Sequence, residues 1–209
     1  MYRVEDKFIL DSNNYHEIVK RVYGLGGIEI HNARRVNSLY FDTDSLANYR
    51  DSIEGCIPRS KTRIRWYGEK ALTDVLQINI ERKYQTENGR FKSSRILQSG
   101  ERSFIINSRG IWDNEMGNTY PSALIEYRRR YFQLKDVRIT LDTDITYFSV
   151  NESNWKFTRE SIDSRNVLEF KYENVLVRDL MELPNLENVK RFSKYCNAID
   201  AIKAYKWIL

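Results

Sequence analysis

The sequence lacks the features of several protein classes. No apolar run reaches the roughly 18 residues of a membrane-spanning helix, and the N-terminus has no apolar core of a signal peptide. The two cysteines, Cys56 and Cys196, lie far apart and outside any CxxC pattern, which argues against a disulfide framework. The two histidines, His16 and His31, have no metal-ligand spacing. We therefore expect a reduced, cytoplasmic setting and no membrane segment in this chain.

Charged residues are numerous and carry a moderate positive excess. The 209 residues include 34 Lys and Arg against 29 Asp and Glu, a formal net charge of +5. This excess favours an anionic ligand, whereas so many carboxylates argue against a nucleic-acid coat, and no nucleic-acid partner is expected. The length suits a single domain, 1–209, with its own core.

The segment 61–92 shows the strongest pattern. In its first half, Lys61, Arg63 and Arg65 share one parity, and uncharged residues share the other. After a break at 68–73 that contains glycine, Glu81 and Lys83 share one parity against isoleucines. Because successive strand side chains point to opposite faces, the segment is predicted to be an antiparallel hairpin with one charged face.

The same pattern recurs along the chain. Basic residues fall on one parity of at least five predicted strands, namely Lys7, Arg63 and Arg65, Lys83, Arg138, and Lys171. In several strands a carboxylate lies two residues away, at Glu5, Glu81 and Glu169. Two arrangements fit these residues. The charged faces could turn to water over an apolar core, or a sheet of about eight strands could close with the charges inside. Inward cations would repel one another, so the second arrangement implies a phosphate-rich ligand.

Periodicity and turn signals predict a mainly antiparallel α+β fold. Strands are expected at 2–10, 35–41, within the hairpin and from 90 onward, and at 123–133, 137–147, 155–160 and 166–172. Helices are expected at about 11–22, 45–53 and 175–181, within 95–120, and from about 193.

Several short motifs, taken in order, resemble one known family. They are Glu5 with Lys7 and Phe8, SLYFDT at 38–43, KTRIRWYG at 61–68, IERK at 80–83, YRRRYFQ at 127–133, RITLDT at 138–143, VLEFKY at 167–172 and RFSKY at 191–195. Their order and spacing over nearly the whole chain resemble the VTC domain, the polyphosphate-polymerase branch of the CYTH or triphosphate tunnel superfamily. The resemblance implies an eight-stranded tunnel-like barrel with a charged interior and flanking helices, and so favours the inward arrangement.

The resemblance also implies a reaction and its residues. The family transfers the γ-phosphate of ATP to growing inorganic polyphosphate with Mn²⁺ or Mg²⁺, so ATP and polyphosphate are the implied partners. The implied catalytic cations are Arg63, Arg65, Lys83, Arg129, Arg138 and Lys194. The implied phosphate-binding residues are Lys7, Lys61, Lys92, Tyr127, Lys171, Arg191 and Ser193, with Arg191 where lysine is expected. Tyr127 and Ser193 could instead make structural hydrogen bonds.

Three carboxylates are metal candidates. Glu169 matches the metal-binding glutamate of the family. Glu5 and Glu81 are weaker candidates, because pairing with a neighbouring lysine explains each of them at least as well. Carboxylate oxygens are hard ligands that suit Mg²⁺ or Mn²⁺.

Other functions remain open from the sequence. A tunnel triphosphatase would give the terminal phosphate of a nucleotide or of tripolyphosphate to water. A non-catalytic module that binds polyphosphate or nucleotide would keep the cations but could dispense with Glu169. Adenylate cyclase activity, also found in the superfamily, fits the detailed motifs less well.

Overall fold

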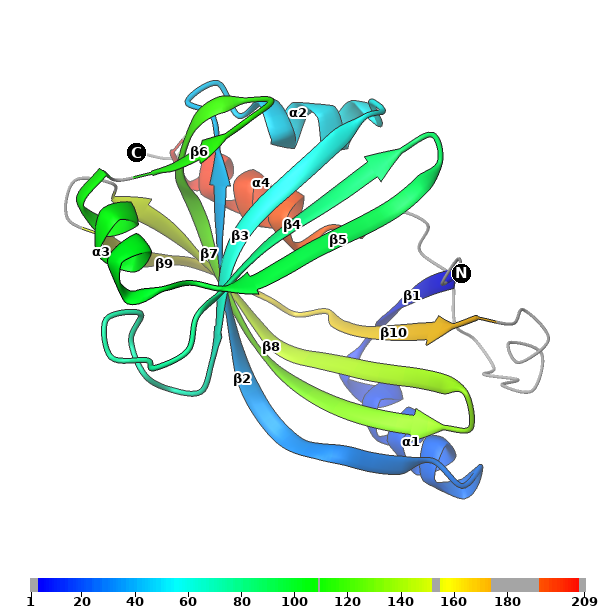
Figure 1. Ribbon diagram of the computed structural model, residues 1–209. Coiled ribbons are helices and arrows are strands. Elements are labelled where there is room, and N and C mark those ends of the chain that lie inside the picture. Colours follow the sequence, from blue (N-terminus) through cyan, green and yellow to red (C-terminus); the bar gives the residue numbers. More distant parts are fainter. Residues whose placement is uncertain (1–3, 109, 152–154, 174–191, 207–209) are drawn as a thin grey trace. The chain divides into compact units, whose positions relative to one another are not determined.

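The computed structural model describes residues 4–108, 110–151, 155–173 and 192–206. Ten strands and four helices form within these ranges (Figure 1). Eight strands follow one another in the order β1-β10-β8-β7-β2-β3-β4-β5, while β6 pairs with β7 and β9 pairs with β8. The elements are β1 (Val4–Leu10), α1 (Ser12–Gly24), β2 (Ile28–Asp42), α2 (Ala47–Glu54), β3 (Arg59–Tyr67), β4 (Asn79–Thr86), β5 (Gly89–Ile96), α3 (Ser99–Ser108), β6 (Ile111–Asp113), β7 (Gly117–Leu134), β8 (Val137–Asn151), β9 (Lys156–Asp163), β10 (Asn166–Tyr172) and α4 (Lys194–Lys206).

The predicted mainly antiparallel α+β architecture is confirmed. Strand pairs β1–β10, β10–β8, β2–β3, β3–β4 and β4–β5 are all antiparallel. Helices flank the strands, as expected. None of the helices that the structure describes has the length and apolar character needed to span a bilayer.

The chain divides into two compact units. Unit 1 contains residues 1–35, 127–145 and 162–192, and unit 2 contains residues 36–126, 146–161 and 193–209. The long strands β2, β7 and β8 each contribute residues to both units.

Unit 1 has a core between α1 and its strands. Asp11 caps α1 by accepting a hydrogen bond from the Asn14 amide at 2.8 Å, as its position before an amphipathic segment predicts. The apolar stripe of α1 then reaches a buried cluster of strand residues. After the helix the chain turns closely at Gly27, where a Cβ would come within 2.7 Å of the Val22 carbonyl oxygen. The core residues are Leu10, Ile18, Val22, Phe132, Leu134, Val137, Ile139, Leu141, Leu168, Phe170 and Tyr172.

Unit 2 has a separate core on the apolar face of β3. Ile64 and Trp66 pack there with Leu39 and Phe41 of β2, Ile105 of α3 and other buried residues. The predicted strand across 74–78 is wrong, because β4 begins only at Asn79. The segment before β4 forms turns instead and buries Leu72, Val75 and Ile78 in the core.

Other predicted boundaries need smaller corrections. Strand β2 begins at Ile28 rather than near 35, and β7 begins at Gly117 rather than near 123. Helix α2 begins at Ala47 rather than near 45, and Asp42 and Thr43 stabilise its start by accepting hydrogen bonds from the Asn48, Tyr49 and Ala47 amides. The predicted helix at 175–181 lies outside the described residues.

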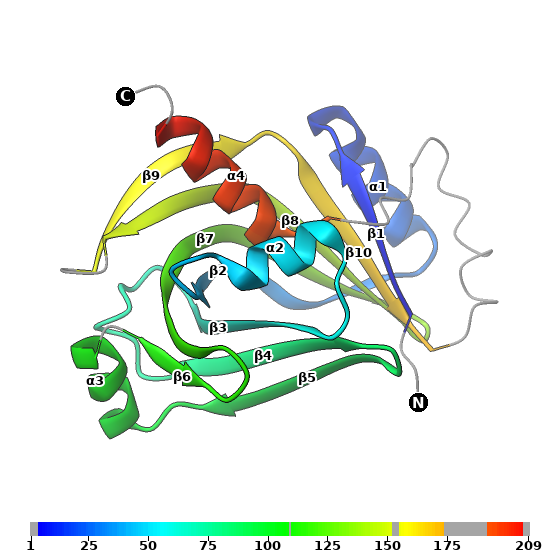
Figure 2. The same cartoon turned by 90° about the horizontal axis from the view of Figure 1, so that it is seen from above.

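In unit 2, α2 and α4 lie side by side (Figure 2). The Tyr49 hydroxyl of α2 donates to the Asp200 carboxylate of α4 at 2.5 Å. At the start of α4, the Tyr195 hydroxyl donates to Asp42 at 2.5 Å. One exposed and one buried tyrosine–carboxylate bond therefore fix the last described helix within this unit.

Candidate functional site

The charged face of β3 is buried. Arg63 is 6% exposed, Arg65 is 7% exposed and Glu81 of β4 is 4% exposed. The opposite face is also buried, because Ile64 and Trp66 belong to the core of unit 2. The interpretation of this strand as a half-buried one with charges facing water is therefore wrong, and the charged face is an interior one.

Strand register brings six predicted residues of unit 2 together. Lys61 lies opposite Lys83, which lies opposite Lys92, so three lysines form one row across β3, β4 and β5. In the next row Arg63 lies opposite Glu81. Like charges directly opposite one another destabilise a sheet unless an anion neutralises them. We name this set the Glu81 cluster; it contains Lys61, Arg63, Arg65, Glu81, Lys83 and Lys92.

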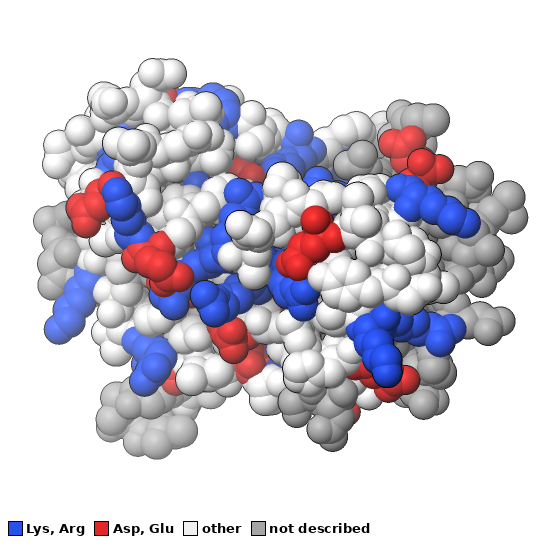
Figure 3. All heavy atoms as spheres, turned by 90° about the horizontal axis from the view of Figure 1, so that it is seen from below, with Lys and Arg blue, Asp and Glu red and all other residues white. Residues whose placement is uncertain are grey.

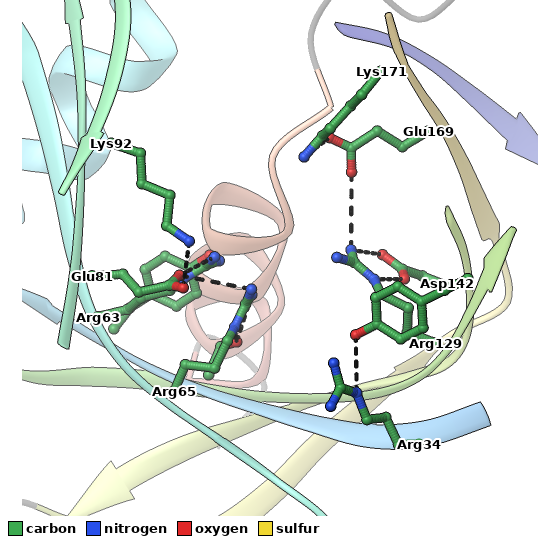
Figure 4. Close-up of polar contacts among 12 residues, drawn as sticks. Arg34, Arg63, Arg65, Glu81, Lys92, Arg129, Asp142, Glu169 and Lys171 are labelled. Carbon is green, nitrogen blue, oxygen red and sulfur yellow. Dashed lines mark hydrogen bonds and ion pairs between the residues drawn. The ribbon is translucent and has the colours of Figure 1, made fainter. Parts of the chain in front are cut away.

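Glu81 holds the cations of this cluster (Figure 4). Arg63 donates from Nε and Nη2 to Oε2 at 2.8 and 2.6 Å, and Lys92 donates to Oε1 at 2.5 Å. Arg65 Nη1 lies 3.7 Å from Oε2. Burial alone would raise the pKa of the Glu81 carboxyl, but Arg63, Arg65 and Lys92 outweigh it and lower the pKa to about 2. Glu81 is thus ionised and fully engaged by cations, which supports its alternative role as a lysine and arginine partner.

Residues of β2 orient the two arginines. The Tyr40 hydroxyl accepts a hydrogen bond from Arg63 Nη1 at 2.7 Å, and the Ser38 hydroxyl accepts from Arg65 Nη2 at 3.1 Å. The Tyr195 ring of α4 stacks on Tyr40 with centroids 4.9 Å apart. The sequence reasoning assigned no role to Ser38 or Tyr40, although both belong to SLYFDT and share a strand parity.

The start of α4 adds hydroxyl and thiol groups to the Glu81 cluster. Lys61 Nζ donates to the Ser193 hydroxyl at 2.9 Å and lies 3.7 Å from the Cys196 sulfur. Burial lowers the pKa of Lys61, partly offset by Cys196 and Tyr40. The Ser193 oxygen also accepts from the Cys196 amide at 3.3 Å, so Ser193 caps the helix. Ser193 therefore makes the structural hydrogen bond that was one of its two predicted roles, and its hydroxyl proton can still be donated to a ligand.

Unit 1 contains a second charged face. Lys7 of β1 lies opposite Glu169 of β10, and Glu5 lies opposite Lys171. On its other side β10 places Lys171 opposite Arg138 of β8. With Asp142 of β8 and Arg129 of β7, these residues form a set that we name the Glu169 cluster: Glu5, Lys7, Arg129, Arg138, Asp142, Glu169 and Lys171.

The carboxylates of the Glu169 cluster share its cations (Figure 4). Arg129 donates to both oxygens of Asp142 at 2.5 and 2.7 Å and lies 3.9 Å from Glu169. Lys171 Nζ lies 3.0 Å from Glu169. Burial would raise the pKa of Glu169, but a hydrogen bond shared with Glu5 and the charges of Lys171, Lys7 and Arg129 hold that pKa well below its usual value. Asp142, fully buried, was not among the residues predicted for the site.

Aromatic rings pack against the arginines of unit 1. The Arg129 guanidinium lies 5.2 Å from the centroid of Tyr127, which is buried. Arg34, a further arginine that was not predicted, contacts Tyr131. Its Nε donates a hydrogen bond to the Tyr131 hydroxyl at 3.3 Å (Figure 4). The exposed Arg138 also approaches the Tyr131 ring, at 5.9 Å. Arg34 could have been noticed from its parity, which matches that of Ser38 and Tyr40 along β2.

The remaining predicted residues fall as follows. Lys194 is the first residue of α4, and Arg191 lies outside the described residues. Of the two arginines beside Arg129, Arg128 is exposed, and Arg130 is half-buried and bound to Glu29 at 2.8 Å. Both histidines are exposed. Figure 3 shows basic side chains interspersed with acidic ones on the face that it draws, so exposed cations are not segregated from exposed carboxylates there.

The three metal candidates do not form one group. Glu81 belongs to the cluster of unit 2, whereas Glu5 and Glu169 lie near each other in unit 1, where Lys171 Nζ is 3.9 Å from Glu5 and 3.0 Å from Glu169. In the part of the chain that the structure describes, no three His, Cys, Asp or Glu side chains are placed to hold a metal ion. The Glu5–Glu169 pair still offers adjacent hard oxygen ligands of the kind that Mg²⁺ and Mn²⁺ prefer.

The sequence as a whole matches one family model. The model is that of the VTC domain, and it covers residues 2–203. The chain belongs to the VTC domain family. The resemblance inferred from the motifs is thereby confirmed, and it extends over both units of this VTC domain. No curated protein gives a significant match to the sequence.

Solved structures share the fold of this VTC domain at low sequence identity. A proposed adenylate cyclase from Bacillus halodurans is 13% identical, with a TM-score of 0.61 over 94% of this chain and 98% of the other. A proposed adenylate cyclase from Vibrio parahaemolyticus is 12% identical, with a TM-score of 0.55 over 95% and 98% of the two chains. A chain of the Schizosaccharomyces pombe Mediator head module is 10% identical, with a TM-score of 0.52 over 100% and 94%. These likenesses support the fold alone.

Proposed function

We propose that this VTC domain is a polyphosphate polymerase that transfers the γ-phosphate of ATP to a growing polyphosphate chain. Membership of the family supports the assignment. In the reaction, an oxygen at the end of the acceptor chain forms the new bond to the γ-phosphorus as the bond to ADP breaks. Such a transfer needs positioning and charge neutralisation more than covalent chemistry by the protein.

The observation that carries the proposal is the excess of cations over carboxylates around the buried Glu81. Arg63, Arg65 and Lys92 contact this single carboxylate, and Lys61, Lys83 and Lys92 stand in one row across the strands. Arg63 and Arg65 are buried forks held in place by Tyr40 and Ser38, so they are oriented before a ligand arrives. A linear polyanion would balance this excess of cations, and its repeating phosphates suit cations that recur along one row of the sheet.

The second cluster fits a divalent cation. Glu5 and Glu169 provide adjacent carboxylates, and the depressed pKa of Glu169 keeps it ionised and able to bind a metal. Bound Mn²⁺ or Mg²⁺ would neutralise phosphate charge. In this cluster, Arg129 is held by Asp142, and Lys7 and Lys171 flank Glu169 as point charges for phosphate oxygens.

Incubation of the pure chain with ATP and Mn²⁺ tests the proposal, with and without a short polyphosphate primer. Products are resolved by gel electrophoresis, by ADP measurement and by free-phosphate assay. Long chains formed together with ADP are the expected result. Free phosphate without chains would replace the polymerase by a triphosphatase, and binding of intact ATP without turnover would leave a binding module.

The variant Glu169→Gln sharpens this experiment. Loss of one metal-binding carboxylate is expected to lower metal-dependent turnover by about 100-fold or more, while the circular-dichroism spectrum stays unchanged. Gln keeps the size and one oxygen of the side chain. Normal turnover of this variant would remove Glu169 from the metal site and leave the phosphate-binding role of the Glu81 cluster intact.

A further inference from the structure

One buried hydroxyl of unit 1 lacks a partner. Thr140 of β8 is only 2% exposed, yet its Oγ1 makes no hydrogen bond to any residue that the structure describes. Buried hydroxyls are normally satisfied, because leaving one unpaired costs the free energy of its lost hydration. A residue chosen only for packing at this position could be valine, which has the same shape without the polar atom.

The place of this hydroxyl in the sheet is informative. Thr140 lies directly opposite Glu169 on the neighbouring strand, and Glu169 lies directly opposite Lys7. Side chains of directly opposite residues lie on the same face with Cβ atoms roughly 5 Å apart. The neighbours of Thr140 along the strand, Ile139 and Leu141, belong to the core on the other face. Thr140 therefore projects beside the Glu5–Glu169 carboxylate pair.

We infer that the Thr140 hydroxyl is a third oxygen ligand of the divalent cation proposed at Glu5 and Glu169, bound directly or through a metal-bound water. The inference rests on the proposed metal site and adds a residue that was not among the metal candidates predicted from the sequence. A neutral hydroxyl suits this place because hard cations bind neutral as well as anionic oxygen ligands.

A pair of threonine variants separates this role from a structural one. In Thr140→Val the shape is kept and only the unpartnered hydroxyl is lost, so the metal-free protein should melt at the same temperature or higher. The control is Thr119→Val, because Thr119 is fully buried and donates to the Ile111 carbonyl at 2.7 Å. Loss of that satisfied bond should lower the melting temperature.

Binding of Mn²⁺ alone to the full chain gives the second readout, followed by the electron paramagnetic resonance signal of free Mn²⁺. Thr140→Val should bind Mn²⁺ about tenfold more weakly than the unaltered chain, whereas Thr119→Val should bind it equally well. Affinity equal to that of the unaltered chain in Thr140→Val would overturn the inference. A fall in its metal-free melting temperature like that of Thr119→Val would also overturn it, by showing that the hydroxyl is paired within the fold.

The variant Glu169→Gln distinguishes failure of the inference from failure of the metal site. If Glu169→Gln loses Mn²⁺ and Thr140→Val keeps it, only the role of Thr140 falls. If Glu169→Gln keeps Mn²⁺, or the unaltered chain does not bind it, the metal site and the inference fall together. The polymerase assignment is tested apart from both, by the products formed from ATP.

Discussion

The two charged clusters solve the same problem of buried charge in different ways. In the Glu169 cluster, four cations lie among three carboxylates, so most charges find a partner within unit 1. The Glu81 cluster contains five cations and one carboxylate, which contacts three of them, Arg63, Arg65 and Lys92. The Glu169 cluster is therefore close to neutral by itself, whereas the Glu81 cluster has a large positive excess. This difference indicates that the Glu81 cluster is the one that needs an external anion.

The largest expected effect comes from removing the carboxylate at the centre of each cluster. Glu81→Gln should lower the free energy of unfolding by about 3–5 kcal/mol, because it leaves Arg63 and Lys92 buried or half-buried without their anion. Asp142→Asn should cost a similar amount, since it removes the bidentate partner of Arg129. Denaturant unfolding measures both losses.

Tripolyphosphate should separate these two variants. It should restore more stability to Glu81→Gln than to Asp142→Asn, because Arg129 still has Glu169 nearby, at 3.9 Å. Equal restoration of stability in the two variants would contradict this difference between the clusters, since both would then need an external anion.

The next largest effect is a dependence of stability on pH that Glu81 causes. Its pKa is about 2 in the folded chain and 4.5 for the ordinary group, so ionised Glu81 stabilises the fold at pH above about 4.5. That contribution of roughly 3 kcal/mol is lost as the pH falls from about 4.5 through 2. The free energy of unfolding, measured between pH 5 and 2, should therefore fall more steeply for the unaltered chain than for Glu81→Gln. Parallel curves would show that Glu81 does not carry this dependence.

A smaller effect is expected on ligand binding. Arg63→Ala should weaken tripolyphosphate binding about tenfold or more, because charged hydrogen bonds of a buried fork to phosphate are lost. Isothermal titration measures the change, and the exposed Arg128 supplies a matched control as Arg128→Ala. Unchanged affinity in Arg63→Ala would refute the phosphate-binding role of the Glu81 cluster.

The smallest effect is expected for the half-exposed end of the same cluster. Lys92 contacts Glu81 at 2.5 Å, but its side chain is 45% exposed. Lys92→Ala should change stability by less than about 1 kcal/mol, because solvent screens such pairs. Its effect on tripolyphosphate affinity should also shrink as salt is added. A loss as large as that of Arg63→Ala would place Lys92 at the centre of the site.

Much of the fold could be predicted from the sequence. Strand β10 is correct at both ends, and the alternation in β3 and β8 correctly separates the polar parity from the core parity. Alternation is informative there because each strand has a buried apolar face. The segment 74–78 failed because its apolar residues pack from turns, which alternation over a few residues does not distinguish from a strand.

The candidate site was predicted less completely. Motif order predicted most of the cations that the structure brings together in the two clusters. It could not group Glu81 apart from Glu5 and Glu169, because grouping depends on strand pairing between distant segments. Tyr40, Asp142 and Thr140 were missed for a related reason: each acts on a partner across a strand pair, and no local pattern reports that partner.

The docking of α4 also has a consequence for synthesis of the chain. Lys61 and Ser193 are 132 positions apart, so Lys61 and the cations beside it leave the ribosome well before the segment that contacts Lys61. Domains begin to fold as they emerge, and the lysine row is complete by Lys92. We therefore expect the nascent chain to be more adhesive toward polyanions than the finished one. A fragment ending before Ser193 should elute from heparin at higher salt than the full chain. Elution at equal salt would show that α4 does not shield the cations of unit 2 from polyanions.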